Sequence, residues 1–312
     1  MKRKAKNMLD LSIIIVNWNT KNLIMSCLYS IYQTTNSIGF EIIVIDNAST
    51  DGSISAIEKK FSHVILVKNN ENKGFAAANN QGIKQAQGEF ILLLNSDTIV
   101  LDNAIGKSVK FLKSRPEIGA LGCKLLYPDG SPQPSANPRF GSLGGALLAK
   151  TGILHLLPRA SREAYKGPAS YANAREVAMV KGAFLLLRRK ALDKVGTLDE
   201  RFFMYAEETD LCFRLRGAGW KIYFYPDAEV IHHGGGSIQS FEQKMKIQRQ
   251  RTVSRLLFIK KHHKRMYYIL YRYLGVLYNA SMLLGLLISG KKNNERTKVI
   301  QAKLRAFFTM EV

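Results

Sequence analysis

Cysteine is scarce in this 312-residue sequence, and its placement argues against two classes of protein. The three residues, Cys27, Cys123 and Cys212, lie far apart and form no C-x-x-C motif. A disulfide framework needs paired cysteines, and a structural zinc site needs closely spaced ones. We therefore expect three free thiols in a reducing compartment.

Two phosphate-binding signatures are also absent. No G-x-G-x-x-G follows the first apolar segment, and no G-x-x-x-x-G-K-[ST] occurs in the chain. Dinucleotide-binding folds and P-loop proteins depend on these backbone cradles for their phosphates. The sequence therefore gives no support to either class.

The N-terminus lacks the features of a signal peptide. The segment MKRKAKNMLDLSIIIVNWN is basic and then apolar, but Asp10 interrupts it and no small-residue cleavage site follows. Secretory signals need both an uninterrupted apolar region and such a site. We expect a basic tail followed by the first strand.

Acidic residues are few: 24 Asp and Glu stand against 46 Lys and Arg, a formal net charge of +22. About +13 of this charge falls after residue 240. Such an imbalance is typical of proteins that bind nucleic acid or an anionic membrane surface. The charge alone does not decide between these two partners.

The basic C-terminal part contains the apolar segment 267–290, YYILYRYLGVLYNASMLLGLLISG, between KKHHKR and KK. Basic clusters around an apolar, aromatic segment favour an anionic membrane surface over nucleic acid. About 24 residues suffice to cross a bilayer. Arg272 and Asn279 favour an interfacial helix or a helical hairpin no less than a spanning helix. A buried helical core is the alternative; we expect membrane association and no nucleic-acid partner.

Strands and helices alternate along the first 125 residues. Apolar segments at 11–18, 41–47, 63–69 and 89–97 predict strands, and the segments between them predict helices. The first helix should bury Leu23, Cys27, Leu28 and Ile31, and Gly88 should stop the third. This order predicts an α/β fold with a mostly parallel sheet and right-handed crossovers.

Each predicted strand ends in polar residues. They are Asn17, then Asp46, then Lys73 and Gly74 after the third strand, and finally Asn95, Ser96 and Asp97. Ligands bind beyond the carboxyl ends of strands in open α/β sheets, so a base, a ribose and a diphosphate could bind there. Asp46 could accept hydrogen bonds from a ribose or a pyrimidine, and Asp97 could hold a divalent ion. An Asp after a strand is also an ordinary turn or capping residue.

A second cluster of functional residue types lies near residue 208. The segment YAEETD begins a predicted helix with three acids, among them Glu207 and Glu208. Acids stabilise a helix N-terminus, but mutual repulsion would also raise the pKa of at least one, which suits a general base. Further on, IHHGGGS places His232 at a strand end, where a neutral imidazole could bind a metal. A structural histidine is the alternative.

Together these segments resemble the inverting glycosyltransferases of family 2, which have the Rossmann-like GT-A fold. Within that family they resemble the bacterial rhamnosyltransferase-like group that builds cell-surface polysaccharides. The resemblance covers about residues 10–240. It rests on SIIIVNWN, VIDNASTDGS, NKGFAAANNQGI, LLLNSDT, GAFLLLRR, LDERFFMYAEETDLCFRLRGAGW and VIHHGGGS.

The resemblance implies roles on the donor side. Asn95-Ser96-Asp97 stands where the family has D-x-D, which leaves Asp97 as the carboxylate ligand of Mn²⁺ or Mg²⁺. It also implies contacts with the nucleobase or ribose for Asp46. The remaining matches, all implied to be donor-binding, are Lys73, Gly74 and Asn79.

The same resemblance implies a catalytic base and a second metal or diphosphate contact. The base falls on Glu208, where the family usually has Asp, and Glu207 is the fallback. His232 matches the histidine before the glycines. The implied reaction is a single displacement with inversion, without a covalent sugar–enzyme intermediate.

The resemblance also suggests substrates and an organisation. L-Rhamnose from dTDP-rhamnose is the first guess for the sugar, and a sugar on a polyprenyl diphosphate, or a glycan, for the acceptor. We expect a GT-A domain over residues 1–240 and a membrane-associating helical region over 241–312, at the cytoplasmic face of the cell membrane. The Pro- and Ser-rich segment 127–142 should be a loop, and we hypothesise a lid over the acceptor.

Three alternatives stay open at this point. A membrane-tethered scaffold could keep the fold without catalysis, because fold does not dictate function. A basic nucleic-acid-binding protein would account for the charge. A nucleotidyltransferase would use a similar sheet, although the acidic helix and the HHGGGS segment favour sugar transfer.

Overall fold

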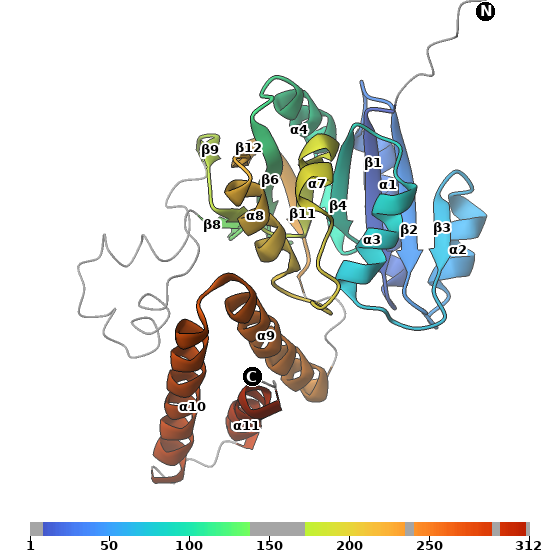
Figure 1. Cartoon of the computed structure of the whole chain (residues 1–312). Helices are drawn as coiled ribbons and strands as arrows, with labels where there is room; N and C mark the ends of the chain where they lie inside the picture. Colours follow the sequence, from blue (N-terminus) through green and yellow to red (C-terminus); the bar gives the residue numbers. More distant parts are fainter. Residues whose placement is uncertain (1–8, 138–171, 235–239, 289–293, 310–312) are drawn as a thin grey trace, which may run out of the picture. The chain divides into compact units, whose positions relative to one another are not determined.

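The computed structural model describes residues 9–137, 172–234, 240–288 and 294–309 (Figure 1). Up to residue 137 the elements are β1 (Leu11–Asn17), α1 (Lys21–Thr34), β2 (Phe40–Asp46), α2 (Ser53–Lys60), β3 (Ile65–Lys68), α3 (Phe75–Gln85), β4 (Phe90–Asn95), β5 (Thr98–Val100), α4 (Ala104–Lys113), β6 (Ile118–Leu126), β7 (Pro132–Gln133) and β8 (Ala136–Asn137). From residue 172 they are β9 (Arg175–Glu176), β10 (Met179–Val180), β11 (Phe184–Arg188), α7 (Arg189–Val195), α8 (Glu207–Gly217), β12 (Lys221–His232), α9 (Phe241–His262), α10 (Arg265–Ile288) and α11 (Asn294–Thr309).

The described chain divides into two compact units. The larger comprises residues 9–137, 172–200 and 208–234. The smaller comprises residues 201–207 together with 240–288 and 294–309. The segment that leads into α8 therefore groups with the C-terminal helices.

One sheet organises the larger unit, with the strand order β3-β2-β1-β4-β11-β6-β12-β5 (Figure 1). Strands β1 to β4 are parallel, β11 runs antiparallel between β4 and β6, and β12 is parallel to β6. The carboxyl ends of β1, β2, β3, β4, β6 and β12 consequently lie at one edge of the sheet. Strands β11 and β5 begin at that edge because they run the opposite way.

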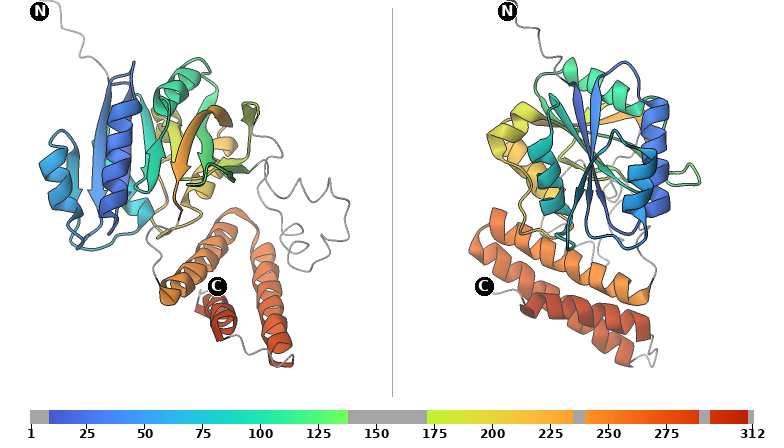
Figure 2. Two further views of the ribbon diagram at one scale, coloured as in Figure 1. Left: turned by 180° about the vertical axis from the view of Figure 1, so that it is seen from behind. Right: turned by 90° about the vertical axis from the view of Figure 1, so that its right-hand side faces the viewer.

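Helices cover both faces of this sheet, as the right-hand view of Figure 2 shows. Side chains of β1 alternate between the two apolar layers: Ile13 and Ile15 pack with the residues of α1 and α4, and Ile14 packs with those of α3. Such alternation follows from the two-residue period of a strand. The residues Phe90–Leu94 of β4 are at most 1% exposed, so β4 is the buried central strand that its apolar run predicts.

Three local expectations need correction. In α1 the buried residue of the first turn is Ile24 instead of Leu23, which is half-buried. Helix α3 ends at Gln85 and not at Gly88, whose backbone lies against that of Leu11. The segment 127–142 contains the short strands β7 and β8, because both find partners in β6 and β10; its residues from 138 onward lie outside the described part.

Helices α9, α10 and α11 pack together in the smaller unit. Their apolar core comprises Leu256, Ile259, Tyr268, Tyr271 and Phe307. Ser240 and Gln243 form a reciprocal capping box that starts α9. Within the described residues, α10 alone is long and apolar enough to cross a membrane, and 17% of its most apolar window is buried.

Candidate active site

The ends of β1 and β2 join in a buried polar pair. Asn17 lies opposite Asp46 in the strand register, and both are 0% exposed. Asn17 Nδ2 donates to Asp46 Oδ2 at 2.7 Å, and the backbone N–H of Ser49 donates to Asp46 Oδ1 at 2.8 Å. These bonds fix the orientation of the Asp46 carboxylate, and each of its oxygens can accept more than one hydrogen bond.

A chain of hydroxyls links this pair to the end of β4. Thr20 Oγ1 donates to Asn17 Oδ1 at 2.7 Å and lies 3.0 Å from Ser96 Oγ. The backbone N–H of Asn95 donates to the carbonyl of Ala183, directly before β11. The ends of β1, β2 and β4 and the start of β11 therefore meet in one hydrogen-bonded group.

Asp97 faces His232 across the same edge, because β5 pairs with the end of β12. Asp97 Oδ1 lies 3.3 Å from His232 Nε2, and Asn95 Nδ2 lies 3.3 Å from the same nitrogen. Burial acts to raise the pKa of the Asp97 carboxyl. The hydrogen bond and charge of His232, with the backbone N–H groups of Asp97 and Gly234, outweigh it, so this pKa lies below its ordinary value.

Gln133 on β7 holds the His232 ring in one orientation. Gln133 Nε2 donates to the His232 carbonyl at 3.2 Å, which leaves its Oε1 to accept from Nδ1–H of the ring at 2.6 Å. Because Gln133 holds Nδ1, Nε2 is the ring nitrogen that faces Asp97. Metal-binding histidines in proteins commonly donate their other ring N–H in this way.

The Asp97–His232 pair suits a divalent cation. A carboxylate oxygen and an imidazole nitrogen that face each other at 3.3 Å need a proton or a cation between them. Among the described residues, no group of three or more His, Cys, Asp or Glu could hold a metal ion. Further ligands of an ion at this pair would therefore be a substrate's phosphate oxygens and water, as is usual for Mg²⁺.

Glu208 lies on the first turn of α8, beside the start of β11. A methyl group at Gly182 would lie in ordinary van der Waals contact, 3.8 Å from Glu208 Cβ and 3.7 Å from Phe75 Cε1, so Glu208 and Phe75 both border Gly182. Removal from water raises the pKa of the Glu208 carboxyl. The hydrogen bonds of Thr209 and the charge of Lys181 lower it without cancelling the rise.

The other two acids of this turn, Glu207 and Asp210, are buried, whereas Glu208 is half-buried. Glu207 is 4% exposed and Asp210 is 0% exposed. Asp210 Oδ2 accepts from Arg214 Nε at 2.8 Å, and the Arg214 guanidinium also donates to the backbone carbonyls of residues 195–197. Asp210 therefore has a structural role, because it anchors the loop before α8.

Of the residues predicted from NKGFAAAN, Gly74 is bonded to the end of β2, whereas Lys73 and Asn79 are not. Gly74 begins α3 with φ +83°, its N–H donates to Asn72 Oδ1 at 2.9 Å, and its carbonyl accepts from Asn47 Nδ2 at 3.2 Å. These bonds tie it to the end of β2, beside Asp46. Lys73 is exposed, and Asn79 Nδ2 donates to the Phe75 carbonyl within α3 at 2.8 Å.

Sequence reasoning missed several residues of this group: Thr20, Ser49, Gln133 and Gly182. Gln133 has no local signal, because its importance depends on the pairing of β7 with β6. Gly182 is the first residue of the segment GAFLLLRR, and a glycine just before a buried strand indicates a close approach of another chain segment.

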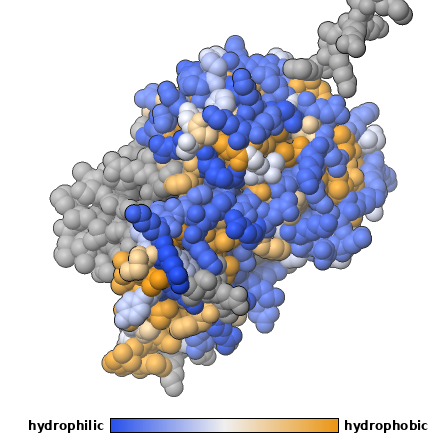
Figure 3. Space-filling view, in the orientation of Figure 1, coloured by the Kyte–Doolittle hydropathy of each residue, from blue (hydrophilic) through white to orange (hydrophobic). Residues whose placement is uncertain are grey.

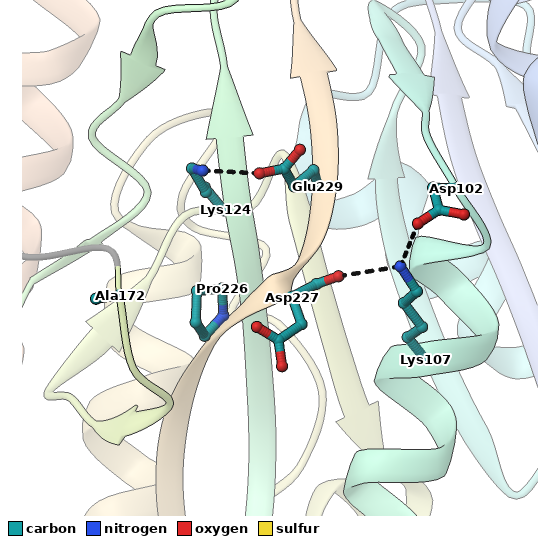
Figure 4. Close-up of a pocket in the computed structure, with 7 residues that line it drawn as sticks. All are labelled: Asp102, Lys107, Lys124, Ala172, Pro226, Asp227 and Glu229. Carbon is teal, nitrogen blue, oxygen red and sulfur yellow. Dashed lines mark hydrogen bonds and ion pairs between the residues drawn. The ribbon is translucent and has the colours of Figure 1, made fainter.

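A separate surface pocket of about 270 Å³ lies away from these residues (Figure 4). Four of its charged groups form two ion pairs: Lys124 Nζ lies 2.7 Å from Glu229 Oε1, and Lys107 Nζ lies 2.5 Å from Asp102 Oδ2. None of the predicted site residues lines this pocket. Because both of its lysines are paired with carboxylates of the pocket, we assign it no function.

Comparisons with solved structures define the class of fold. A mannosyltransferase, PcManGT from Pyrobaculum calidifontis, in complex with GDP-Man and Mn²⁺, aligns with a TM-score of 0.57 at 18% identity, over 97% of this chain and 87% of that one. GalNAc-T7 with UDP, GalNAc and Mn²⁺ aligns with a TM-score of 0.56 at 16% identity, over 82% of this chain and 48% of that one. The predicted GT-A-like α/β fold is confirmed.

The sequence comparisons identify the family. The chain belongs to Glycosyl transferase family 2, whose profile matches residues 12–196. An N-acetylglucosaminyl-diphospho-decaprenol L-rhamnosyltransferase of Mycobacterium tuberculosis is 34% identical over 204 residues, which span 62% of this chain and 66% of that protein. The O-antigen biosynthesis protein RfbC of Myxococcus xanthus is 30% identical over 230 residues, 72% of this chain and 17% of that protein.

Proposed function

We propose that the protein is an inverting, metal-dependent glycosyltransferase that moves a sugar from a nucleotide-sugar donor to a lipid-linked or glycan acceptor in cell-surface polysaccharide synthesis. One observation carries the proposal: Asp46, Asp97 and Glu208 lie at, or directly beside, one edge of the sheet of a family 2 glycosyltransferase. This edge is where α/β sheets bind their ligands.

The donor would bind along this edge. Asn17 and Asp46 would contact the nucleoside, because their buried pair offers fixed acceptors. The remaining donor-binding positions in this proposal are Lys73, Gly74, Asn79, Asn95 and Ser96. Asp97 and His232 would hold Mn²⁺ or Mg²⁺, which when bound would neutralise charge on the diphosphate as it leaves.

Glu208 would act as the general base, with Glu207 as the alternative. Its carboxylate accepts the proton of an acceptor hydroxyl as that oxygen bonds to the anomeric carbon of the sugar. The bond from this carbon to the diphosphate oxygen breaks on the opposite face, so the configuration inverts and a nucleoside diphosphate leaves. The raised pKa of Glu208 supports the assignment, because a base works best when its pKa lies nearer the working pH.

L-Rhamnose from dTDP-rhamnose is our first choice for the transferred sugar. The support is the 34% identity to the mycobacterial L-rhamnosyltransferase, whose name also gives a decaprenol diphosphate carrier for its acceptor. For the present chain we propose a sugar on a polyprenyl diphosphate as acceptor. Such a lipid presents its head group at a membrane surface.

The helical region would bring the enzyme to that surface. We propose that residues 1–240 form the glycosyltransferase domain and that 241–312 associate with the cytoplasmic face of the cell membrane. One side of α10 carries large apolar side chains that are 47–78% exposed and recur at helical spacing, over which Figure 3 shows a hydrophobic surface. They are Met266, Leu270, Tyr273, Leu277, Leu284 and Ile288.

An in-plane position of α10 is favoured over a spanning one. The buried side of α10 packs within the helical unit: Arg272 Nε donates to the Phe307 carbonyl of α11 at 2.6 Å, and Gly275 lies against the Phe307 ring. A spanning α10 would draw the basic helix α11 towards hydrocarbon, at about 3 kcal/mol for each charge near the bilayer centre. The exposed side faces an anionic bilayer instead, flanked by Lys264 and Arg265.

Replacing Leu270 and Leu277 together by serine should weaken binding to phosphatidylglycerol-containing vesicles at least about tenfold, since each buried leucine contributes about 2 kcal/mol. Co-sedimentation would measure the effect. Ile65→Ser, which removes an exposed apolar residue from β3, is the matched control and should bind like the wild type. Equal binding of all three proteins would exclude this side of α10 as the membrane surface.

The experiment that tests the function is a donor screen by calorimetry, followed by a transfer assay. The wild type would be titrated with dTDP-rhamnose and with common UDP- and GDP-sugars, each with and without Mn²⁺ or Mg²⁺. We expect one donor to bind tightly, and only with the metal. Failure of every donor to bind would reject the transferase and favour a membrane-tethered scaffold; salt-sensitive binding of duplex DNA would favour the nucleic-acid alternative.

A further inference from the structure

The turn that leads into α8 has an unusual backbone. Tyr205 and Ala206 are consecutive residues with φ of +69° and +68°, and α8 begins immediately afterwards at Glu207. In this left-handed region the Cβ atom of any residue other than glycine clashes with the backbone, so such residues adopt it at a steric cost. Two in succession persist only where the surroundings hold them.

Helix α9 supplies the contacts that hold this turn. Ser254 Oγ donates to the Met204 carbonyl at 2.7 Å and in turn accepts from Gln250 Nε2 at 3.1 Å. Ser254 is 1% exposed, so water does not replace this bond. Close by on the same helix, the Arg251 guanidinium lies 4.8 Å from the centre of the Tyr205 ring. Residues 201–207 belong to the same compact unit as α9.

We propose that Ser254 and Arg251 are positioning residues for the catalytic base. By holding the strained turn, they fix the backbone conformation of residues 204–206, from which the first turn of α8 and its carboxylate, Glu208, continue. The inference rests on the proposed function, in which Glu208 is the base. It gives the C-terminal helices a part in catalysis that is separate from membrane binding.

This role would follow from the sequence order. Glu208 stands two residues after Ala206, so a change in the φ angles of the turn changes the backbone from which the first turn of α8 continues. A displacement of about 1 Å at a reacting group can lower a rate by as much as about 100-fold. The donor groups on β1, β2 and β4 are on other elements, so donor binding should be unaffected.

The test compares Ser254→Ala with Thr252→Ala in the full-length protein. Thr252 lies on the same helix, but its hydroxyl donates to the Gln248 carbonyl within α9 at 2.9 Å. We expect Ser254→Ala to lower kcat at least about tenfold with an unchanged Kd for the donor, whereas Thr252→Ala stays near the wild type. Thermal unfolding of each variant would verify that it is folded.

A rescue variant separates positioning from general destabilisation. Glycine adopts positive φ without a clash, so Ala206→Gly should restore most of the lost kcat when combined with Ser254→Ala. Equal kcat for Ser254→Ala and Thr252→Ala, or absence of rescue by glycine, would overturn the proposal. Full activity of Glu208→Gln would instead remove the base assignment on which it rests, so the two failures are distinguishable.

Discussion

Replacement of Asp97 by asparagine should lower sugar transfer on the order of 10³-fold and remove the dependence of donor binding on Mn²⁺. Asparagine keeps the shape of the side chain but loses the charge that faces His232 at 3.3 Å. A neutral amide is a weak ligand for a hard cation, and it cannot balance the charge of an ion between the two residues. Steady-state transfer rates and donor titrations with and without Mn²⁺ would measure both effects.

The control for this variant is Asp102→Asn. Asp102 is an aspartate five positions later whose side chain is 88% exposed and pairs with Lys107. Exposed ion pairs of this kind contribute about 0–1 kcal/mol, so the control should transfer sugar at the rate of the wild type. If Asp97→Asn kept both its activity and its Mn²⁺ response, the proposed metal site would be wrong.

Glu208→Gln should lower kcat on the order of 10³-fold while the Kd for the donor stays the same. The amide has the size of the carboxylate but cannot accept the proton of the acceptor hydroxyl. Glu208→Asp keeps a carboxylate that can accept this proton, so it should retain much more activity. Glu207→Gln is the comparison: a larger loss there than at Glu208 would transfer the role to Glu207.

The raised pKa of Glu208 also determines the direction in which transfer activity should change with pH. Burial raises the pKa of Glu208, and a base must be deprotonated to act. Activity of the wild type should therefore rise with pH through an apparent pKa above the ordinary value of a glutamate, and fall as the carboxylate is protonated below it. A pH–kcat profile that stays flat across this range would contradict the assignment.

Much of the site was predictable from local sequence. Apolar runs that stop at Asn17, Asp46 and Asn95 predict buried strands, and parallel strands must bring their ends to one edge. The Asn17–Asp46 bond of 2.7 Å is a direct consequence of that register. Each apolar run and its polar end lie within one short segment, so local sequence carries the information about where the strands end.

The contacts of Glu208 and His232 were not predictable in the same way. Glu208 reaches the edge because β11 inserts antiparallel between β4 and β6 and brings Gly182 beside it. His232 is oriented by Gln133, on a two-residue strand that has no periodicity to detect. Both depend on pairings between segments that lie far apart along the chain.

The sequence by itself determined the family, the order of strands and helices from β1 to β4, the carboxylate at the end of β4, the acidic first turn of α8 and the basic, apolar C-terminal region. Only the tertiary structure decided which acid lies beside Gly182, which way the His232 ring turns, and which side of α10 stays exposed. It also decided that α9 holds the strained turn before α8. The reason is physical: periodicity and capping are local properties of a chain, whereas strand neighbours and helix contacts depend on non-local packing.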